Sequence, residues 1–433
     1  MGPASFGKVP SQSRQKGQGH VRATTLLNRL LGFKGTVVDS FEFVGSWLVA
    51  HVRLRSKLLV CPCGQTSQAA PHATSRRRWR HVDLGRWKVR IEADVRRMKC
   101  GGCRQTRTEW VPWARPGSRF TRDFEDAVAW FAARMSKTGV AKVMGTCWRS
   151  VTAIVARLVD MHLDEDRLDK LYRIGIDEIA YRKGRKFLTV IANHDTSNVV
   201  WMGEGRSQAV VEQFFDLLGP QRCKQITAVS MDMGPAYREA VRTHLPDATI
   251  CFDPFHVIKW AGEALNASYN AANPRAADLI VDDLNPSQAW RRVRHCLRVG
   301  QEDLDPAGQA ILEQLRKRYP RLHRGWQLKE QLRELYRSVN PKHAAAHLKK
   351  WITSALRSNI NGFVSLARRL RRHFAGIVAA VQLGLSNSLV EGANAGIRLI
   401  QSRAYGYAKL DNLIIMIYLC HGGIPLRTPT ETS

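Results

Sequence analysis

The chain has 433 residues, and 67 lysines and arginines against 37 acidic residues give it a net charge of +30. Apolar residues make up 44% of the sequence, which excludes wholesale disorder, and the length predicts roughly two to four domains. The longest apolar runs, Gly376–Leu385 and Asn412–Cys420, are shorter than the ~18–20 residues of a membrane span. Residues 1–18 lack the apolar segment of a secretory leader, so we expect a soluble intracellular protein.

The positive charge is concentrated near the start of the chain. Residues 1–120 hold 23 basic and 6 acidic residues, a net charge of +17. An excess of this size predicts a polyanionic partner, either nucleic acid or an anionic membrane face, with solvated surface charge as the plainer alternative. Nucleic acid is the favoured interpretation.

Residues 26–115 are predicted to form a small strand-rich module that follows a disordered basic tail, residues 1–25. Apolar side chains alternate along Thr36–Val60 and again along 87–95, as in half-buried strands. Cysteines occur here in two close pairs about 37 residues apart, which are Cys61 with Cys63 and Cys100 with Cys103. In an intracellular chain this clustering indicates a structural zinc ion, since four bound thiolates replace the core that a short module lacks.

The first cysteine pair is tighter than the second. One residue separates Cys61 from Cys63, whereas two residues are usual in a zinc knuckle. His72 or His81 is therefore an alternative ligand in place of one of them, and a coincidental grouping of thiols is the alternative to zinc.

Residues 116–170 are predicted to be helical and to bind DNA. Thr121 is a suitable cap for a first helix, and a short helix, a turn at Gly145 and another helix follow. These are the proportions of a helix-turn-helix, whose second helix would present Arg149 and Ser150 to a major groove. A plain helical hairpin has the same pattern, and the preceding basic module favours the DNA-binding interpretation.

The pattern changes to that of an α/β unit after Tyr172. Three strands are predicted first, then helix, strand, helix and strand, at 173–180, 186–193, 198–202, 207–218, 225–232, 235–245 and 248–253. This order is that of a ribonuclease-H-like core. Residues 261–380 are predicted to be a helical insertion, so that the core comprises 171–260 and 381–423. The fold class is thus multidomain α+β, an interrupted ribonuclease-H-like α/β core with an N-terminal zinc-binding β module and a helix-turn-helix.

Two carboxylates end apolar strands of this unit, Asp177 and Asp232. Since the first and fourth strands of such a sheet are neighbours, we expect both carboxylates to converge, with Glu391 on a helix beside them. Three carboxylates in an otherwise basic protein suit two Mg²⁺ (or Mn²⁺) ions, which prefer oxygen ligands and catalyse phosphoryl transfer in pairs. Helix capping or simple surface exposure is the alternative for each acid taken alone.

Several basic-aromatic segments are candidates for phosphate contact, with solvated surface as the alternative. They are Arg76–Arg80, Arg86-Trp87-Lys88, Arg357, Arg368–Arg372, and Arg398 and Arg403 beside Tyr405. In a chain of this charge phosphate contact is favoured for several of them. Each such contact steepens the salt dependence of binding by about one unit of slope.

Four strings of sequence carry a resemblance to a known family. They are Gly175-Ile-Asp-Glu178, Asp232-Met-Gly-Pro-Ala-Tyr237, Phe252-Asp-Pro-Phe-His-Val-Ile-Lys259, and Ser386-Asn-x3-Glu391-Gly-x-Asn394 with Tyr405-Gly406. From the cysteine module to about Gly423, the chain resembles the transposases of the ISL3 family of bacterial insertion sequences.

The resemblance implies that Asp177, Asp232 and Glu391 are the catalytic, metal-binding triad. The 159 residues from 232 to 391 fit a helical insertion before the glutamate. Asp253 and His256 match a D-x2-H element of this class, in which His256 is expected to contact the scissile phosphate or to accept a proton near it. A core histidine at the strand–helix junction is the alternative for His256.

The implied function is that of a DNA transposase. It would bind the terminal inverted repeats of its element through the N-terminal modules, cleave the ends by two-metal hydrolysis and join the 3'-hydroxyls to target DNA. Because both ends must be held at once, we expect a homodimer or larger synaptic complex, in the bacterial cytoplasm at the nucleoid and without a membrane partner. A catalytically inactive, domesticated DNA-binding regulator and a structure-specific nuclease are the alternatives. The candidate DNA contacts are Arg149, Ser150, Arg398 and Arg403.

Overall fold

The computed structural model describes residues 22–67, 73–163, 165–182, 184, 186–272 and 286–429. The expected basic tail lies almost wholly outside the described residues, and His72 also lies outside them. The chain divides into two compact units, Met1–Ile154 with Leu426–Ser433 and Val155–Pro425.

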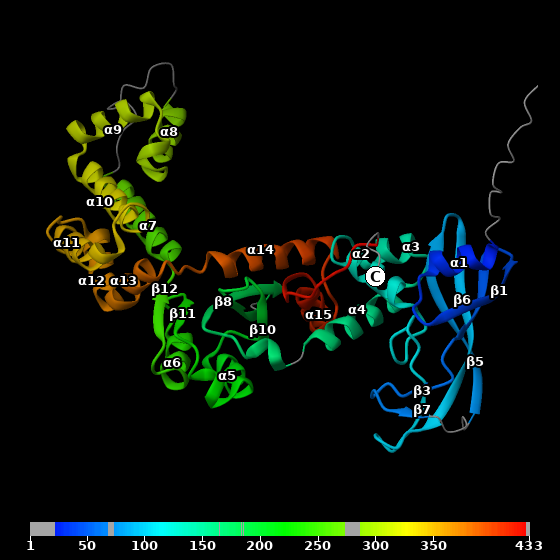
Figure 1. Cartoon of the computed structure of the whole chain (residues 1–433). Coiled ribbons are helices and arrows are strands. Elements are labelled where there is room, and N and C mark those ends of the chain that lie inside the picture. Colours follow the sequence, from blue (N-terminus) through cyan, green and yellow to red (C-terminus); the bar gives the residue numbers. More distant parts are fainter. Residues whose placement is uncertain are drawn as a thin grey trace, which may run out of the picture. The chain divides into compact units, whose positions relative to one another are not determined.

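The first unit contains a five-stranded sheet of order β1-β2-β6-β5, with β7 paired to β6 (Figure 1). Its strands are β1 (Thr36–Val44), β2 (Trp47–Leu54), β5 (Ala73–Leu84), β6 (Trp87–Lys99) and β7 (Thr106–Thr108). The helix α1 (Ala23–Leu31) packs against β1, and alternate side chains such as Val89 and Ile91 enter a core with Trp79 and Trp113. Two short strands, β3 (Leu59–Val60) and β4 (Thr66–Ser67), pair separately beside the cysteines.

The helical part that follows has the predicted proportions. It comprises α2 (Arg122–Ala132), α3 (Lys137–Val143) and α4 (Trp148–His162). The predicted cap is confirmed, because the Thr121 hydroxyl accepts a hydrogen bond from the Phe124 amide at 3.3 Å. The predicted turn is also confirmed, since Gly145 has a φ of 57°, a conformation that glycine adopts without strain.

The second unit is built on a mixed sheet of order β10-β9-β8-β11-β12. Its strands are β8 (Arg173–Arg182), β9 (Lys186–Asn193), β10 (Val199–Glu204), β11 (Ala228–Met231) and β12 (Thr249–Phe252). The predicted adjacency of the first and fourth strands is confirmed, because β8 and β11 pair in parallel. The helices α5 (Gln208–Cys223) and α6 (Pro235–His244) connect β10, β11 and β12.

One strand end differs from the prediction. Asp177 does not end its strand, because β8 continues to Arg182 in antiparallel pairing with β9. The parallel pairing of β8 with β11 does stop at Ile176. At Asp177, β8 therefore has a paired strand only on its β9 side. The side towards β11 is open there, which leaves the Asp177 carboxylate accessible.

A series of helices lies between β12 and the helix that carries Glu391. They are α7 (Pro254–Ala272), α8 (Pro286–Arg298), α9 (Pro306–Arg318), α10 (Pro320–Arg337), α11 (Ala344–Leu356), α12 (Asn361–Arg372) and α13 (Phe374–Leu383), with the short η3 (Gln301–Asp303) and η4 (Pro341–His343). The helices α10 and α12 pack on α7, and α13 packs on β12. Lys329 secures α10 to the end of α8, because its ammonium donates to the carbonyls of Leu297 and Val299 at 2.7 and 2.8 Å.

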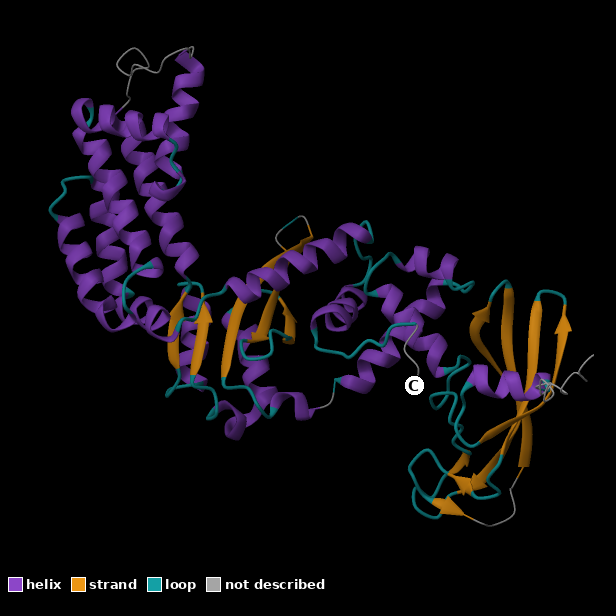
Figure 2. Ribbon diagram, turned by 45° about the horizontal axis from the view of Figure 1, so that its top comes forward, coloured by secondary structure: helices purple, strands orange, loops and turns teal. Residues whose placement is uncertain are grey.

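The chain then returns to the sheet through α14 (Ser388–Arg403) and α15 (Leu410–His421). The helix α14 crosses β8 and also contacts β9, and it runs along the sheet in Figure 2. Among the described residues, only α13 and α14 taken together reach the length and apolarity of a membrane span, and an 85° bend separates them; no single helix does so.

Candidate active site and metal centres

Three aspartates lie at the same level of three neighbouring parallel strands. Ile176 pairs with Met231, and Met231 pairs with Phe252, so Asp177, Asp232 and Asp253 each follow one of these paired residues. Adjacent strands lie about 4.8 Å apart. The sequence predicts that Asp177 and Asp232 converge, and the register also sets Asp253 beside them.

Asp253 differs from the other two aspartates in its partners. It is 2% exposed, and one of its oxygens lies 3.0 Å from His256 Nδ1. Its other oxygen accepts a hydrogen bond from the Asn387 amide at 3.2 Å. Because its side chain is almost wholly buried and each oxygen contacts a different partner, Asp253 orients His256 and the residue that precedes α14.

His256 lies between two carboxylates. Its Nδ1 faces Asp253, and its Nε2 lies 3.5 Å from an oxygen of Asp232. The hydrogen bond to Asp253, helped by the charge of Asp232 and opposed by burial, raises the pKa of His256 above its usual value. The structure therefore places the predicted His256 in the site, with one ring nitrogen fixed and the other facing Asp232.

Glu391 reaches the site because α14 approaches β8 very closely. A Cβ atom on Gly175 would lie 2.5 Å from Val390 Cγ2 and 3.0 Å from the Ser230 hydroxyl, so only glycine allows this packing. Val390 directly precedes Glu391 on α14. The glycine of the Gly175-Ile-Asp-Glu178 string thus has a steric role that spacing alone does not reveal.

Asn387 fixes the start of the same helix. Its side chain is buried, donates to the Ile176 carbonyl at 3.0 Å and accepts from the Ser230 hydroxyl at 2.6 Å. Its own carbonyl accepts from the Glu391 amide at 2.8 Å, which begins α14. The strand of Asp177, the strand leading to Asp232 and the helix of Glu391 are thus tied together through one side chain.

Asn394 completes the surroundings of Asp177. Its amide donates to Asp177 Oδ2 at 2.8 Å, and the Glu178 amide donates to Asp177 Oδ1 at the same distance. Burial, with the nearby charges of Glu178 and Glu391, still raises the pKa of Asp177 to about 6. Burial and the charge of Asp253 also raise the pKa of Glu391.

These acids form a donor set that fits hard cations. Asp177, Asp232 and Glu391 offer only oxygen atoms as ligands. Burial and neighbouring carboxylates raise the pKa of Asp177 and of Glu391, which a nearby cation would oppose. The side-chain oxygen of Asn394, Oδ1, is also buried and has no hydrogen-bond partner in the described part of the chain. The two buried asparagines, Asn387 and Asn394, were not predicted as site residues, although both belong to the Ser-Asn-x3-Glu-Gly-x-Asn string.

The four predicted cysteines form one cluster in the first unit. The Cys61 and Cys103 sulfurs lie 3.9 Å apart, the Cys63 and Cys100 sulfurs lie 3.6 Å apart, and all four lie within 4.8 Å of one another. A tetrahedral zinc site with bonds of about 2.3 Å has sulfur separations of roughly 3.8 Å. The cluster therefore fits zinc, including its tight C-x-C pair. His81 is elsewhere, because its Nδ1 lies 2.9 Å from the Thr121 hydroxyl.

The four candidate DNA contacts lie on two helices. Arg149 and Ser150 are in the first turn of α4, where Arg149 is exposed and lies 5.6 Å from the Trp148 ring. Arg398 is exposed on α14, and Arg403 is its last residue. Tyr405 follows with its side chain fully in solvent and a φ of 53°.

Known proteins resemble the chain along most of its length. Residues 174–417 match the ISL3 DDE family described as transposase, and residues 109–159 match the helix-turn-helix domain of transposase family ISL3. The transposase for insertion sequence element IS1557 of Mycobacterium tuberculosis is 36% identical over 430 residues, and the match covers 93% of this chain and 96% of that protein.

The transposase for insertion sequence element IS1001 of Bordetella parapertussis is 27% identical over 398 residues. This match covers 90% of this chain and 97% of that protein. Among solved structures, the catalytic core domain of BIV integrase is 12% identical, with a TM-score of 0.15. This match covers 39% of this chain and 86% of the integrase chain. So low a TM-score has no weight for the fold.

Proposed function

This chain belongs to the ISL3 family of insertion-sequence transposases, and from that premise we propose that it moves its own element. It binds the terminal inverted repeats, cleaves the element ends and joins the freed 3'-hydroxyls to target DNA. The observation that carries this proposal is the in-register placement of Asp177 and Asp232, with α14 held against β8 so that Glu391 acts electrostatically on Asp177.

Asp177, Asp232 and Glu391 are proposed to hold two Mg²⁺ or Mn²⁺ ions. When bound, such ions activate the attacking water or 3'-hydroxyl and stabilise the leaving oxygen. Asn394 holds the Asp177 carboxylate in place, and Asp253 fixes the ring of His256 through Nδ1. His256 can then hold or release a proton at Nε2 beside Asp232, close to where the scissile phosphate would lie.

The proposed division of labour follows the order of the chain. Residues 26–115 are a zinc-binding module, and residues 116–170 a helix-turn-helix in which Arg149 and Ser150 contact DNA. Residues 171–260 and 381–423 form a ribonuclease-H-like catalytic core, which the strand order β10-β9-β8-β11-β12 supports. Residues 261–380 are its helical insertion, and Arg398 and Arg403 contact DNA near the cleavage site.

The zinc ion is proposed to be structural. Cys61 and Cys100 are buried, and their side chains form a small separate cluster with Leu59 and Met98. So few apolar residues bury little surface, and metal binding would supply the missing folding energy there. The active assembly is proposed to be a homodimer or larger complex, because transposition needs both element ends at once.

Cleavage of DNA that carries the element ends tests this function. Purified protein with Mg²⁺ should nick such DNA at the element boundary, and Asp232→Ala should bind the DNA without cutting it. Asp247→Ala is the matched control, because Asp247 is an exposed acid of the same unit outside the site and its loss should leave cleavage unchanged. Equal cleavage by Asp232→Ala would refute the assignment. Cutting without later joining to a plasmid would indicate a nuclease, and binding without cutting by the unaltered protein would indicate a regulator.

A further inference from the structure

The arginines of β5 and β6 divide into two sets by the face of the sheet on which they lie. Arg76 lies opposite Asp94 and Arg78 opposite Glu92, with ion-pair distances of 3.2 and 2.9 Å. On the same face Arg96 pairs with Glu109 at 2.6 Å. These three arginines each contact a carboxylate, which offsets their charge.

The opposite face has arginines without such partners. Arg77 lies between Arg76 and Arg78 on β5, and Arg97 follows Arg96 on β6, so both point to the other side of the sheet. Arg77 donates to the Thr108 hydroxyl at 3.2 Å. Within the described ranges, no carboxylate forms an ion pair with Arg77 or Arg97.

These two arginines line a groove of about 550 Å³ in the first unit. Hydroxyl groups and an indole also line it, from Ser75, Thr106, Thr108 and Trp110. Glu109 is the carboxylate of this lining, and it is 4% exposed and already held by Arg96 through three short contacts. The groove therefore combines uncompensated positive charge with hydrogen-bond donors.

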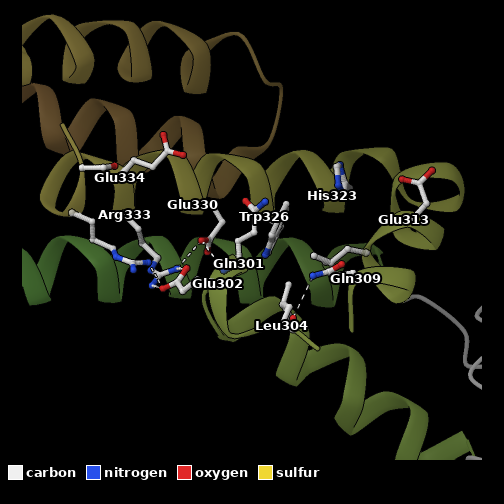
Figure 3. A pocket seen from close by; sticks show the side chains of 13 residues that line it. Gln301, Glu302, Leu304, Gln309, Glu313, His323, Trp326, Glu330, Arg333 and Glu334 are labelled. Carbon is white, nitrogen blue, oxygen red and sulfur yellow. Dashed lines mark hydrogen bonds and ion pairs between the residues drawn. The ribbon is translucent and has the colours of Figure 1, made fainter. Parts of the chain in front are cut away.

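A larger cavity in the second unit lacks this property. It has a volume of about 730 Å³ and lies among η3, α9 and α10 (Figure 3). Its arginines are already held by carboxylates, since Arg333 contacts Glu302 at 2.7 Å and Glu330 at 2.6 Å. Its lining contains four glutamates and two arginines, so it offers no excess positive charge to a ligand.

We propose that the groove lined by Arg77 and Arg97 binds backbone phosphates of duplex DNA beside the sequence that the helix-turn-helix reads. Guanidinium groups and hydroxyls are the donors that phosphate oxygens accept from, and such contacts set the register of a protein on DNA. Continuity of the chain supports this partner, because most residues of 109–117 line the groove and the same segment begins the helix-turn-helix match. The inference rests on the proposed binding of element ends.

Salt titration of DNA binding tests the groove. The affinity for a duplex bearing one element end is measured from 50 to 200 mM NaCl, and each lost phosphate contact should make the slope of log K against log[salt] shallower by about 0.9. Arg77→Ala should therefore change the slope by about 0.9, and Arg77→Ala with Arg97→Ala by about 1.8. Arg76→Ala is the matched control, because it removes one positive charge from the neighbouring position of the same strand. The Arg76 guanidinium already pairs with Asp94, so its loss should leave the slope nearly unchanged.

Two further measurements separate binding from folding. Thermal unfolding of each variant checks that the module is intact, and the double variant Arg77→Lys with Arg97→Lys should restore most of the slope because it keeps both charges. Equal slopes for the alanine variants and the unaltered protein would refute phosphate binding in the groove while leaving the proposed function intact. Equal losses from Arg76→Ala and Arg77→Ala would also overturn it, since general charge would then explain the effect. Failure of the unaltered protein to bind or cut element ends would refute the proposed function as well.

Discussion

Replacing Asn387 by alanine removes the side chain that ties α14 to the sheet. The substitution deletes the bond to the Ile176 carbonyl and the bond from the Ser230 hydroxyl, at a position that is 1% exposed. Ser230 keeps a contact with His194 Nε2 at 2.8 Å, so the Ile176 carbonyl is the group that loses most. A buried polar group left without its partner costs about 1–3 kcal/mol, and the lost packing adds to it. We expect a total loss of about 2–4 kcal/mol.

This loss should appear in both stability and activity. For the unit Val155–Pro425, about 2–4 kcal/mol corresponds to a fall in Tm of roughly 4–8 °C. Asn387 lies one helical turn before Glu391, the proposed metal ligand. Cleavage measured well below the Tm should therefore also slow, by about 10–100-fold, the usual cost of losing a residue that orients a metal ligand.

Calorimetry and a cleavage time course measure the two effects. Ser388→Ala is the control, because its exposed hydroxyl contacts only the Ser386 hydroxyl nearby and its loss should cost less than about 0.5 kcal/mol. An Asn387→Ala variant whose Tm falls by less than about 1 °C and whose cleavage rate equals that of Ser388→Ala would refute the reasoning.

Three other variants or conditions have defined outcomes. Gly175→Ala should slow cleavage by about tenfold or more, because the new methyl meets Val390 at 2.5 Å and displaces α14; an unchanged rate would show that the contact relaxes freely. Cys100→Ser should reduce bound zinc, measured by mass spectrometry, from one ion per chain to nearly none, and undiminished zinc would contradict the four-cysteine site. Burial, with a contribution from Arg80, lowers the pKa of His81 to about 4 from 6.5. The unfolded chain therefore binds the extra proton first, so stability at pH 4 should be about 3 kcal/mol lower than at pH 7, and His81→Gln should flatten this pH dependence in denaturant melts.

Much of the framework follows from local sequence patterns. Alternating apolar residues and the spacing of strands and helices predict the order of elements in the second unit, and that order places Asp177 next to Asp232. Thr121 predicts the start of α2 because capping depends on adjacent residues alone. The two close cysteine pairs predict the four-sulfur cluster, because this spacing is typical of a zinc site. The family membership is confirmed as predicted.

Other features depend on register and therefore could not be predicted from one sequence. The run Arg76–Arg80 is uniformly basic, and only the pairing of β5 with β6 shows that Arg76 and Arg78 face carboxylates while Arg77 does not. The role of Asp253 depends on the Asn387 amide, which is 134 residues away in the chain. The continuation of β8 beyond Asp177 depends on β9, since an acidic pair looks like a strand end when its partner is unknown.

Strand joining tests the central claim most directly. Element ends that already carry a free 3'-hydroxyl are incubated with the protein, Mg²⁺ and a supercoiled plasmid, and joined products are counted. We expect joining by the unaltered protein and by Asp247→Ala, and a loss of about a thousandfold in Asp232→Ala with DNA binding retained. Joining by Asp232→Ala at the rate of the unaltered protein would contradict the assignment of the three carboxylates.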